Sequence, residues 1–194
     1  VYGSSEEKIG QLSKLTKKFK IITKLAHTKS KYNVDENIQF INHELNKSFN
    51  KLNCSNVEVL LVHSVDDLIS DDGDYIYELL KEIKISGRAK QIGISVYTVA
   101  ELANVLSKYD FDVVQFPLNV FNQTFHQSGI LKELKGHGVE LHARSVFLQG
   151  LLLMQSRELD SYFDPIKQNL SEYLDLINKI KLEPVGCALN FIKQ

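Results

Sequence analysis

The fold is decided by the stretch Val57-Glu58-Val59-Leu60-Leu61-Val62-His63, a run that is almost wholly apolar and ends on a histidine. Short runs that are apolar at nearly every position are typical of strands buried on both faces of a parallel sheet. Four further runs share this composition, and each also ends on a polar residue. They are residues 21–24, 91–95, 112–115 and 139–145, which end on Lys24, Ser95, Gln115 and Ser145.

Helices are predicted between these strands, because apolar residues recur there every three or four positions. Asn33 with Glu36, and Thr98 with Glu101, have the spacing of capping boxes that begin two of the helices. Pro184 suits the first turn of the last helix, and Gly87 suits the residue just after a helix end. The predicted helices contain Ile9, Leu12 and Leu15; Ile38, Ile41, Leu45 and Phe49; Ile76, Leu79, Leu80 and Ile83; Leu102, Val105 and Leu106; Ile130, Leu131 and Leu134; Leu170, Tyr173, Leu174, Ile177 and Ile180; and Val185, Ala188, Leu189 and Ile192.

This alternation of strands and helices predicts the α/β class. An open doubly wound sheet and a closed barrel are both compatible with it. No Gly-x-Gly-x-x-Gly follows any strand, so the dinucleotide fingerprint of the open sheet is missing, which favours a (β/α)8 TIM barrel. Eight strands close such a barrel, and five are predicted here. Residues 1–194 are therefore interpreted as one partial barrel domain, an incomplete segment from the middle of a longer protein. Alone, that segment would expose strand edges that closure removes.

The composition limits the classes of partner. The 194 residues are 43% hydrophobic, and their net charge is −1. This charge argues against nucleic acid as a partner, because neutralising phosphates needs a basic face. No apolar run approaches the ~18 residues that span a bilayer. The two cysteines, Cys54 and Cys187, lack metal-ligand spacing. Both are expected to be free thiols in a reducing compartment, which predicts a cytoplasmic protein.

The polar residues that end the five runs predict a site. Carboxyl ends of parallel strands meet at one face of a barrel, and active sites are built on that face. Lys24, His63, Ser95, Gln115 and Ser145 are a poor set of metal ligands, because they offer one imidazole and no carboxylate. The remaining histidines, His27 among them, lack ligand spacing and are interpreted as surface or packing residues.

Six segments in order resemble the aldo-keto reductase superfamily. The first is Tyr2-Gly3-x-Ser5-Glu6-x-x-Ile9-Gly10, which is similar to the segment that carries the family's catalytic tyrosine. A strand ending in lysine and one ending in histidine follow. The next three segments are residues 87–95, 113–119 and 143–152. Each motif is weak alone, and their common order carries the resemblance.

The resemblance implies the reduction of an aldehyde, ketone or sugar carbonyl by a nicotinamide cofactor. Tyr2 would be the general acid. A tyrosine hydroxyl has a pKa of ~10 and donates a proton poorly near neutral pH. Lys24 would lower that pKa, because an ammonium group favours the phenolate. His63 would hydrogen-bond the carbonyl oxygen and orient the substrate.

The same resemblance implies how the cofactor binds. Ser95 and Gln115 match the residues that bind the nicotinamide carboxamide, and Val96 stands where the family often has asparagine. Arg144 stands where a ring often stacks on the nicotinamide, and its planar guanidinium can also stack. Ser145, Leu148 and Gly150 lie in the segment that meets the pyrophosphate. The implied cofactor is NADP (NADPH), without metal or flavin.

Two other classes of function stay open at the level of sequence. The first is a regulatory or partner subunit that binds the cofactor on the same fold, or an inactive fragment of the enzyme. Loss of Tyr2, Lys24 or His63 would favour it, and all three are present. The second is an unrelated barrel enzyme such as a metal-dependent lyase, which would need carboxylate or histidine ligands at several strand ends.

Overall fold

The fold is described from a computed structural model that covers residues 3–12, 18–29, 31–155, 157 and 159–193. Tyr2 and Leu15 lie outside these residues. The chain divides into two compact units, each of which is described by itself. The first comprises Val1–Phe116 and Ile130–His142, and the second comprises Pro117–Gly129 and Ala143–Gln194.

Five strands form one sheet in the order β1-β2-β3-β4-β5. The strands are β1 (Ile22–Lys24), β2 (Val57–Val62), β3 (Ala89–Ser95), β4 (Val113–Pro117) and β5 (Glu140–Arg144). The first four pair in parallel, with Lys24 opposite Leu61, Leu61 opposite Gly93 and Gly93 opposite Val113. Each predicted strand is therefore present, and each pairs with the next one along the chain, as in a barrel segment. The boundaries differ from the predicted ones by one or two residues. β4 does not end at Gln115, because Phe116 and Pro117 are also buried and continue the strand. β2 and β5 end one residue before His63 and Ser145, and Ser145 has a positive φ that no strand adopts.

Helices alternate with the strands of the first unit. They are α1 (Ser5–Gln11), α3 (Val34–Leu52), α4 (Asp66–Ile69), α5 (Gly73–Ile85), α6 (Val99–Leu106) and α8 (Ile130–Gly136). Both predicted capping boxes are present, since Asn33 and Thr98 each accept a bond from the amide of the glutamate three residues on. The turn after α5 places Gly87 at φ 75°, a conformation that glycine adopts at little steric cost.

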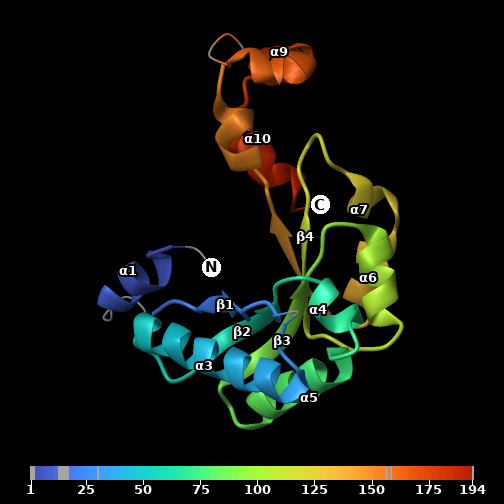
Figure 1. Ribbon diagram of the computed structural model, residues 1–194. Coiled ribbons are helices and arrows are strands. Elements are labelled where there is room, and N and C mark those ends of the chain that lie inside the picture. Colours follow the sequence, from blue (N-terminus) through green and yellow to red (C-terminus); the bar gives the residue numbers. More distant parts are fainter. Residues whose placement is uncertain (1–2, 13–17, 30, 156, 158, 194) are drawn as a thin grey trace. The chain divides into compact units, whose positions relative to one another are not determined.

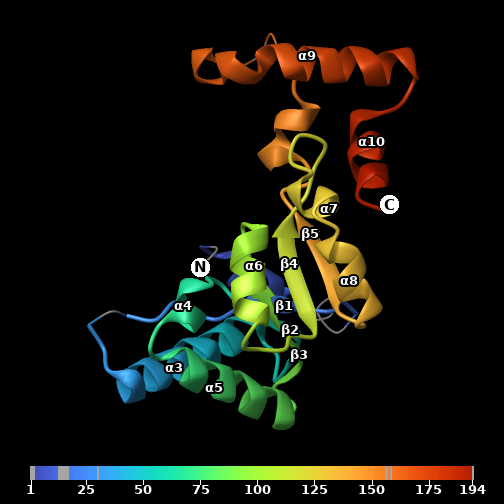
Figure 2. The same ribbon diagram turned by 90° about the vertical axis from the view of Figure 1, so that its right-hand side faces the viewer.

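The core of the first unit lies between the sheet and the two long helices. Figure 1 shows α3 and α5 side by side along β1, β2 and β3, and Figure 2 shows the same arrangement after a quarter turn. Ile41 and Leu45 of α3 and Ile76 and Leu80 of α5 are at most 2% exposed. Burying each such side chain stabilises the fold by about 1.5–3 kcal/mol.

The strands approach closely at Gly93 in the centre of β3. A Cβ atom there would lie 2.4 Å from the carbonyl oxygen of Val113 and 2.7 Å from a methyl carbon of Leu61. The centre of the sheet therefore needs glycine at this position for steric reasons.

The second unit is mostly helical. It contains α7 (Thr124–Gln127), the 3-10 segments η1 (Leu148–Leu153) and η3 (Ser161–Phe163), α9 (Asp164–Lys179) and α10 (Pro184–Phe191). Leu152, Leu170, Leu174 and Ile177 form its apolar cluster. Pro184 occupies the first turn of α10, as predicted.

Candidate functional site

Three predicted site residues lie at one level of three neighbouring strands. His63 directly follows Val62, whose partner on β3 is Ile94, the residue before Ser95. Ser95 is in turn paired with Gln115 on β4. The register therefore places His63, Ser95 and Gln115 in a row across β2, β3 and β4, with His63 just after β2, Ser95 at the end of β3 and Gln115 two residues before the end of β4. In a barrel, this is the end of the strands where active sites are built.

Ser95 and Gln115 interact through their side chains. The Ser95 hydroxyl donates to Oε1 of Gln115 at 3.3 Å. The Val96 amide donates to the carbonyl oxygen of Gln115 at 2.9 Å, which continues the ladder past the end of β3. Ser95 is only 2% exposed, although buried hydroxyl groups are costly unless they are bonded. A hydroxyl beside a carboxamide is a set of donors and acceptors that can pair with the carboxamide of a ligand.

Lys24 and His63 lie on adjacent strands, β1 and the end of β2. Lys24 is paired with Leu61, two residues before His63, and the Leu25 amide donates to the Leu61 carbonyl oxygen at 2.9 Å. Burial lowers the pKa of His63, and electrostatic effects of His27 and Lys24 lower it further. A lowered pKa favours the neutral imidazole, which has one donor nitrogen and one acceptor nitrogen.

Two residues without a predicted role surround His63. The ring of His27 stacks on that of His63, with centroids 4.4 Å apart and planes inclined by 24°. Asp67, in α4, lies 3.2 Å from the Nδ1 atom of His27 and is only 7% exposed. The side chain of His27 is 48% exposed, so the interpretation as a surface or packing residue describes only part of its environment. In the sequence, what could have pointed to a role for His27 is its position three residues after Lys24.

The other predicted cofactor residues lie in the second unit, where the backbone is irregular. Ser145, Leu148, Gln149 and Gly150 all have positive φ, from 47° to 99°. Only the last is glycine, although other residues adopt this conformation at a steric cost. Leu148 packs against the apolar cluster of its unit.

Asn119 forms a hydrogen bond to this irregular segment, a role that was not predicted. It is 2% exposed, and its amide group donates to the Ser145 carbonyl oxygen at 3.2 Å. The Leu118 amide donates to the carbonyl oxygen of Arg144 at 3.1 Å. The Asn119 side-chain oxygen accepts from the amides of Phe121 and Asn122. Its place four residues after Gln115 was the only signal in the sequence.

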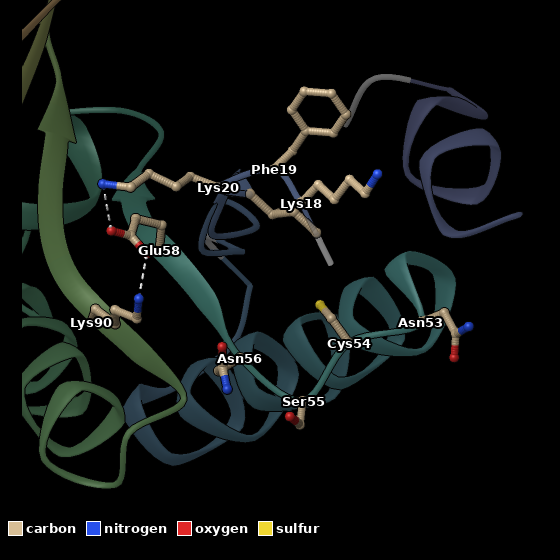
Figure 3. Close-up of a pocket in the computed structure, with 10 residues that line it drawn as sticks. Lys18, Phe19, Lys20, Asn53, Cys54, Ser55, Asn56, Glu58 and Lys90 are labelled. Carbon is tan, nitrogen blue, oxygen red and sulfur yellow. Dashed lines mark ion pairs between the residues drawn. The ribbon is translucent and has the colours of Figure 1, made fainter. Parts of the chain in front are cut away.

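A cavity of about 460 Å³ opens at the opposite, amino-terminal ends of β1, β2 and β3. Figure 3 shows that Glu58 lies between Lys20 and Lys90, with Cys54 and Asn56 further along the wall. Its carboxylate is 3.0 Å from the Lys20 ammonium and 2.8 Å from that of Lys90. These two bonds lower the pKa of Glu58. The cavity is therefore separate from the row of His63, Ser95 and Gln115.

Three further properties bear on the expectations drawn from the sequence. Among the described residues, no three histidine, cysteine or carboxylate side chains are grouped so that they could hold a metal ion. No helix in the described part of the chain is long and apolar enough to cross a membrane. Cys54 and Cys187 are free thiols, as predicted.

Comparisons with solved structures support the same fold. The glycerol dehydrogenase AKR11B4 from Gluconobacter oxydans is similar to this chain, with a TM-score of 0.66 and 18% sequence identity. The similarity covers 97% of this chain and 64% of the dehydrogenase. The holo form of the aldo-keto reductase AKR11C1 from Bacillus halodurans is also similar, with a TM-score of 0.61 and 18% sequence identity. Here the similarity covers 76% of this chain and 50% of the reductase. The five strands and their helices are thus an incomplete segment of the α/β barrel, as predicted.

Comparisons at the level of sequence point to one family. The oxidoreductase YdhF of Escherichia coli (strain K12) is 26% identical over 144 residues, which are 73% of this chain and 46% of YdhF. The chain thus spans about half the length of this curated relative. The model of the aldo/keto reductase family matches residues 1–187. The resemblance of the ordered motifs is therefore confirmed: the chain belongs to the aldo/keto reductase family of oxidoreductases.

Proposed function

We propose that the protein containing this chain reduces an aldehyde, ketone or sugar carbonyl with NADPH or NADH. The observation that carries the proposal is the row of His63, Ser95 and Gln115 across three strand ends, with Lys24 on the next strand. These are the residues to which the family's motifs assign substrate and cofactor binding. NADP is proposed in preference to NAD from the resemblance alone, and a cytoplasmic location remains a prediction from the cysteines.

Three residues would each have a separate role at the carbonyl group, namely Tyr2, Lys24 and His63. The neutral His63 imidazole donates a hydrogen bond to the carbonyl oxygen, which orients the substrate and stabilises negative charge as it develops there. The hydroxyl of Tyr2 gives its proton to that oxygen, and the Lys24 ammonium stabilises the phenolate that remains. The product is an alcohol, whose new O–H proton comes from Tyr2.

The described residues fit a nicotinamide ring. A bound nicotinamide cofactor supplies the hydride that the carbonyl carbon accepts. The hydroxyl of Ser95 and the carboxamide of Gln115, 3.3 Å apart, can hydrogen-bond the carboxamide of the ring. The resemblance alone assigns Arg144, Ser145, Leu148 and Gly150 to binding the remainder of the cofactor.

The test uses the full-length protein. NADPH at 100 times its dissociation constant should stabilise the fold by about 2.7 kcal/mol, and a suitable carbonyl compound should be reduced as NADPH is oxidised. Tyr2→Phe should lower turnover on the order of 10²-fold or more while the thermal shift with NADPH persists, because only the proton donor is lost. Tyr75→Phe is the matched control, since Tyr75 is 58% exposed on α5.

The proposal fails if neither NADPH nor NADH shifts the melting temperature at saturating concentration. Full turnover by the Tyr2→Phe protein under single-turnover conditions would remove Tyr2 from the mechanism, although it would leave the assignment of the cofactor intact.

A further inference from the structure

The loop after β1 brings a second imidazole against His63. The rings of His27 and His63 are stacked, at 4.4 Å between centroids and 24° between planes. His27 comes three residues after Lys24, and His63 follows the end of β2. The contact therefore joins two neighbouring strand ends, and it covers one face of the ring that is proposed to orient the substrate.

Asp67 fixes the other side of this contact. Its Oδ2 atom is 3.2 Å from Nδ1 of His27, while its Oδ1 atom accepts from both the amide and the hydroxyl of Thr28, at 3.0 and 2.8 Å. Asp67 is 7% exposed, and three donors on two successive residues are satisfied by its two oxygens. The contact between Nδ1 of His27 and this carboxylate means that the orientation of the His27 ring is fixed by more than its stacking.

Asn37 anchors the next residue of the loop. The amide of Lys29 donates to Oδ1 of Asn37 at 2.8 Å, and Nδ2 of Asn37 donates to the carboxylate of Asp72 at 2.9 Å. Asn37 is 2% exposed in the first turn of α3. Two buried side chains, Asp67 and Asn37, therefore bind consecutive backbone amides of the loop and determine where His27 lies.

Three ionisable groups in the described part of the chain act electrostatically on His63. His27 comes from the loop, Lys24 from β1 and Asp67 from α4, and the first two disfavour a proton on His63 while Asp67 favours one. Of the first two, His27 has the larger effect on the pKa of His63. The anchored ring is thus placed to favour the neutral form of His63, which can donate to a carbonyl oxygen.

We infer that His27 is a positioning residue: stacked on His63 and bonded to Asp67, it sets the plane of the His63 ring and places a protonatable group beside it. The inference rests on the proposed function, because it assigns His27 a part in carbonyl reduction through His63. The contact itself can nevertheless be measured without turnover.

The first experiment is a pH titration of the His63 ring signals by NMR in the full-length protein, with the substitutions His27→Phe and His27→Ala. Phenylalanine keeps an aromatic ring against His63 but removes the ring nitrogens and the bond to Asp67. The titration midpoint of His63 should rise in both variants, because the electrostatic effect of His27, which lowers the pKa of His63, is lost. His43→Ala on α3 is the matched control, since it removes an exposed histidine and should leave the His63 midpoint unchanged.

The second experiment measures steady-state kinetics with one carbonyl substrate. His27→Ala should lower kcat/KM for the carbonyl roughly tenfold, because a small misplacement of an orienting group is enough for such a loss. The KM for NADPH should stay unchanged. His27→Phe should recover part of the loss, since it restores the stacked ring, and its pH–rate profile should still differ from that of the parent.

The two experiments separate the inference from the proposed function. An unchanged His63 midpoint in both variants overturns the inference, whatever the activity. A raised midpoint in a protein that reduces no carbonyl supports the contact between His27 and His63 and overturns the proposed function instead. An active protein with equal kcat/KM before and after His27→Ala also overturns the positioning role.

Discussion

Polar groups have opposite environments at the two ends of the sheet. At the amino end, Lys20, Glu58 and Lys90 line an open cavity of about 460 Å³ and neutralise one another, with both lysines at least 65% exposed. At the carboxyl end, Ser95 is buried and the pKa of His63 is lowered mainly by its burial. Exposed ion pairs contribute little free energy and cost little, whereas buried polar groups are costly.

This difference shows that the cavity at the amino end is a poorer guide to the site than the free-energy cost of burying polar groups. The ion pairs at the amino end have a sufficient structural explanation, since they join the starts of neighbouring strands. Burial of a polar group such as the Ser95 hydroxyl or the partly buried His63 ring costs free energy that the rest of the fold must offset. Polar groups with shifted pKa values that a fold holds at a cost are candidates for function.

The largest effect expected from this comparison is on catalysis. His63→Ala in the full-length protein should lower kcat/KM for the carbonyl on the order of 10²- to 10³-fold, because a donor to the developing oxyanion is lost. Glu58→Gln should leave kcat/KM unchanged, since it alters only the opposite end of the same strand. Steady-state kinetics with NADPH checks both. Equal losses in the two variants would show that the ends are not functionally distinct.

A smaller effect is expected from the sheet centre, on which both ends depend. Gly93→Ala should destabilise the fold by about 2–3 kcal/mol, because the added methyl group overlaps backbone as well as side-chain atoms. Gly186→Ala in α10 is the control, since among the described residues no atom outside its own stretch of helix lies within 4 Å of a Cβ atom there. Urea unfolding measures the difference. A Gly93→Ala protein as stable as the parent would mean that β3 and β4 can separate without cost.

The smallest expected effect is on the pH dependence of the free energy of unfolding, to which the two ends of the sheet should contribute at different pH values. Below the ordinary value of 6.5, the unfolded chain protonates His63 more readily than the folded chain does, so the free energy of unfolding should decrease as the pH falls through 6.5. The lowered pKa of Glu58 contributes stability above 4.5 that is lost only at lower pH. Urea unfolding of the parent and of His63→Asn at several pH values checks the order. If both proteins respond equally near pH 6.5, His63 is not the group responsible.

Much of the fold follows from local patterns, since strands such as Val57–Val62 are buried on both faces and therefore apolar throughout. The capping boxes at Asn33 and Thr98 were equally readable. The single turn Asp66–Ile69 was not, because one turn is too short to show a helical period. The left-handed backbone at Ser145 and Gln149 was also missed, because residues other than glycine adopt it only when tertiary contacts impose it.

The same distinction applies to the candidate site, because some of its residues could be predicted from the strand pattern and others could not. Lys24, His63 and Ser95 could be predicted because parallel strands bring their carboxyl ends together whatever the loops do. The contact between His27 and His63 could not, because it depends on the path of a loop that Asp67 and Asn37 hold from two different helices. A histidine in a loop has no periodicity from which its partner can be inferred.

The two anchored amides of this loop have a consequence for its motion. Thr28 and Lys29 donate to side chains that are 7% and 2% exposed, on α4 and α3. Their hydrogens can exchange with solvent only after those bonds break, so opening of the loop requires both buried side chains to release the backbone. A surface segment held in this way should open less often than an unanchored loop, and the stacked imidazole should remain in place between those openings.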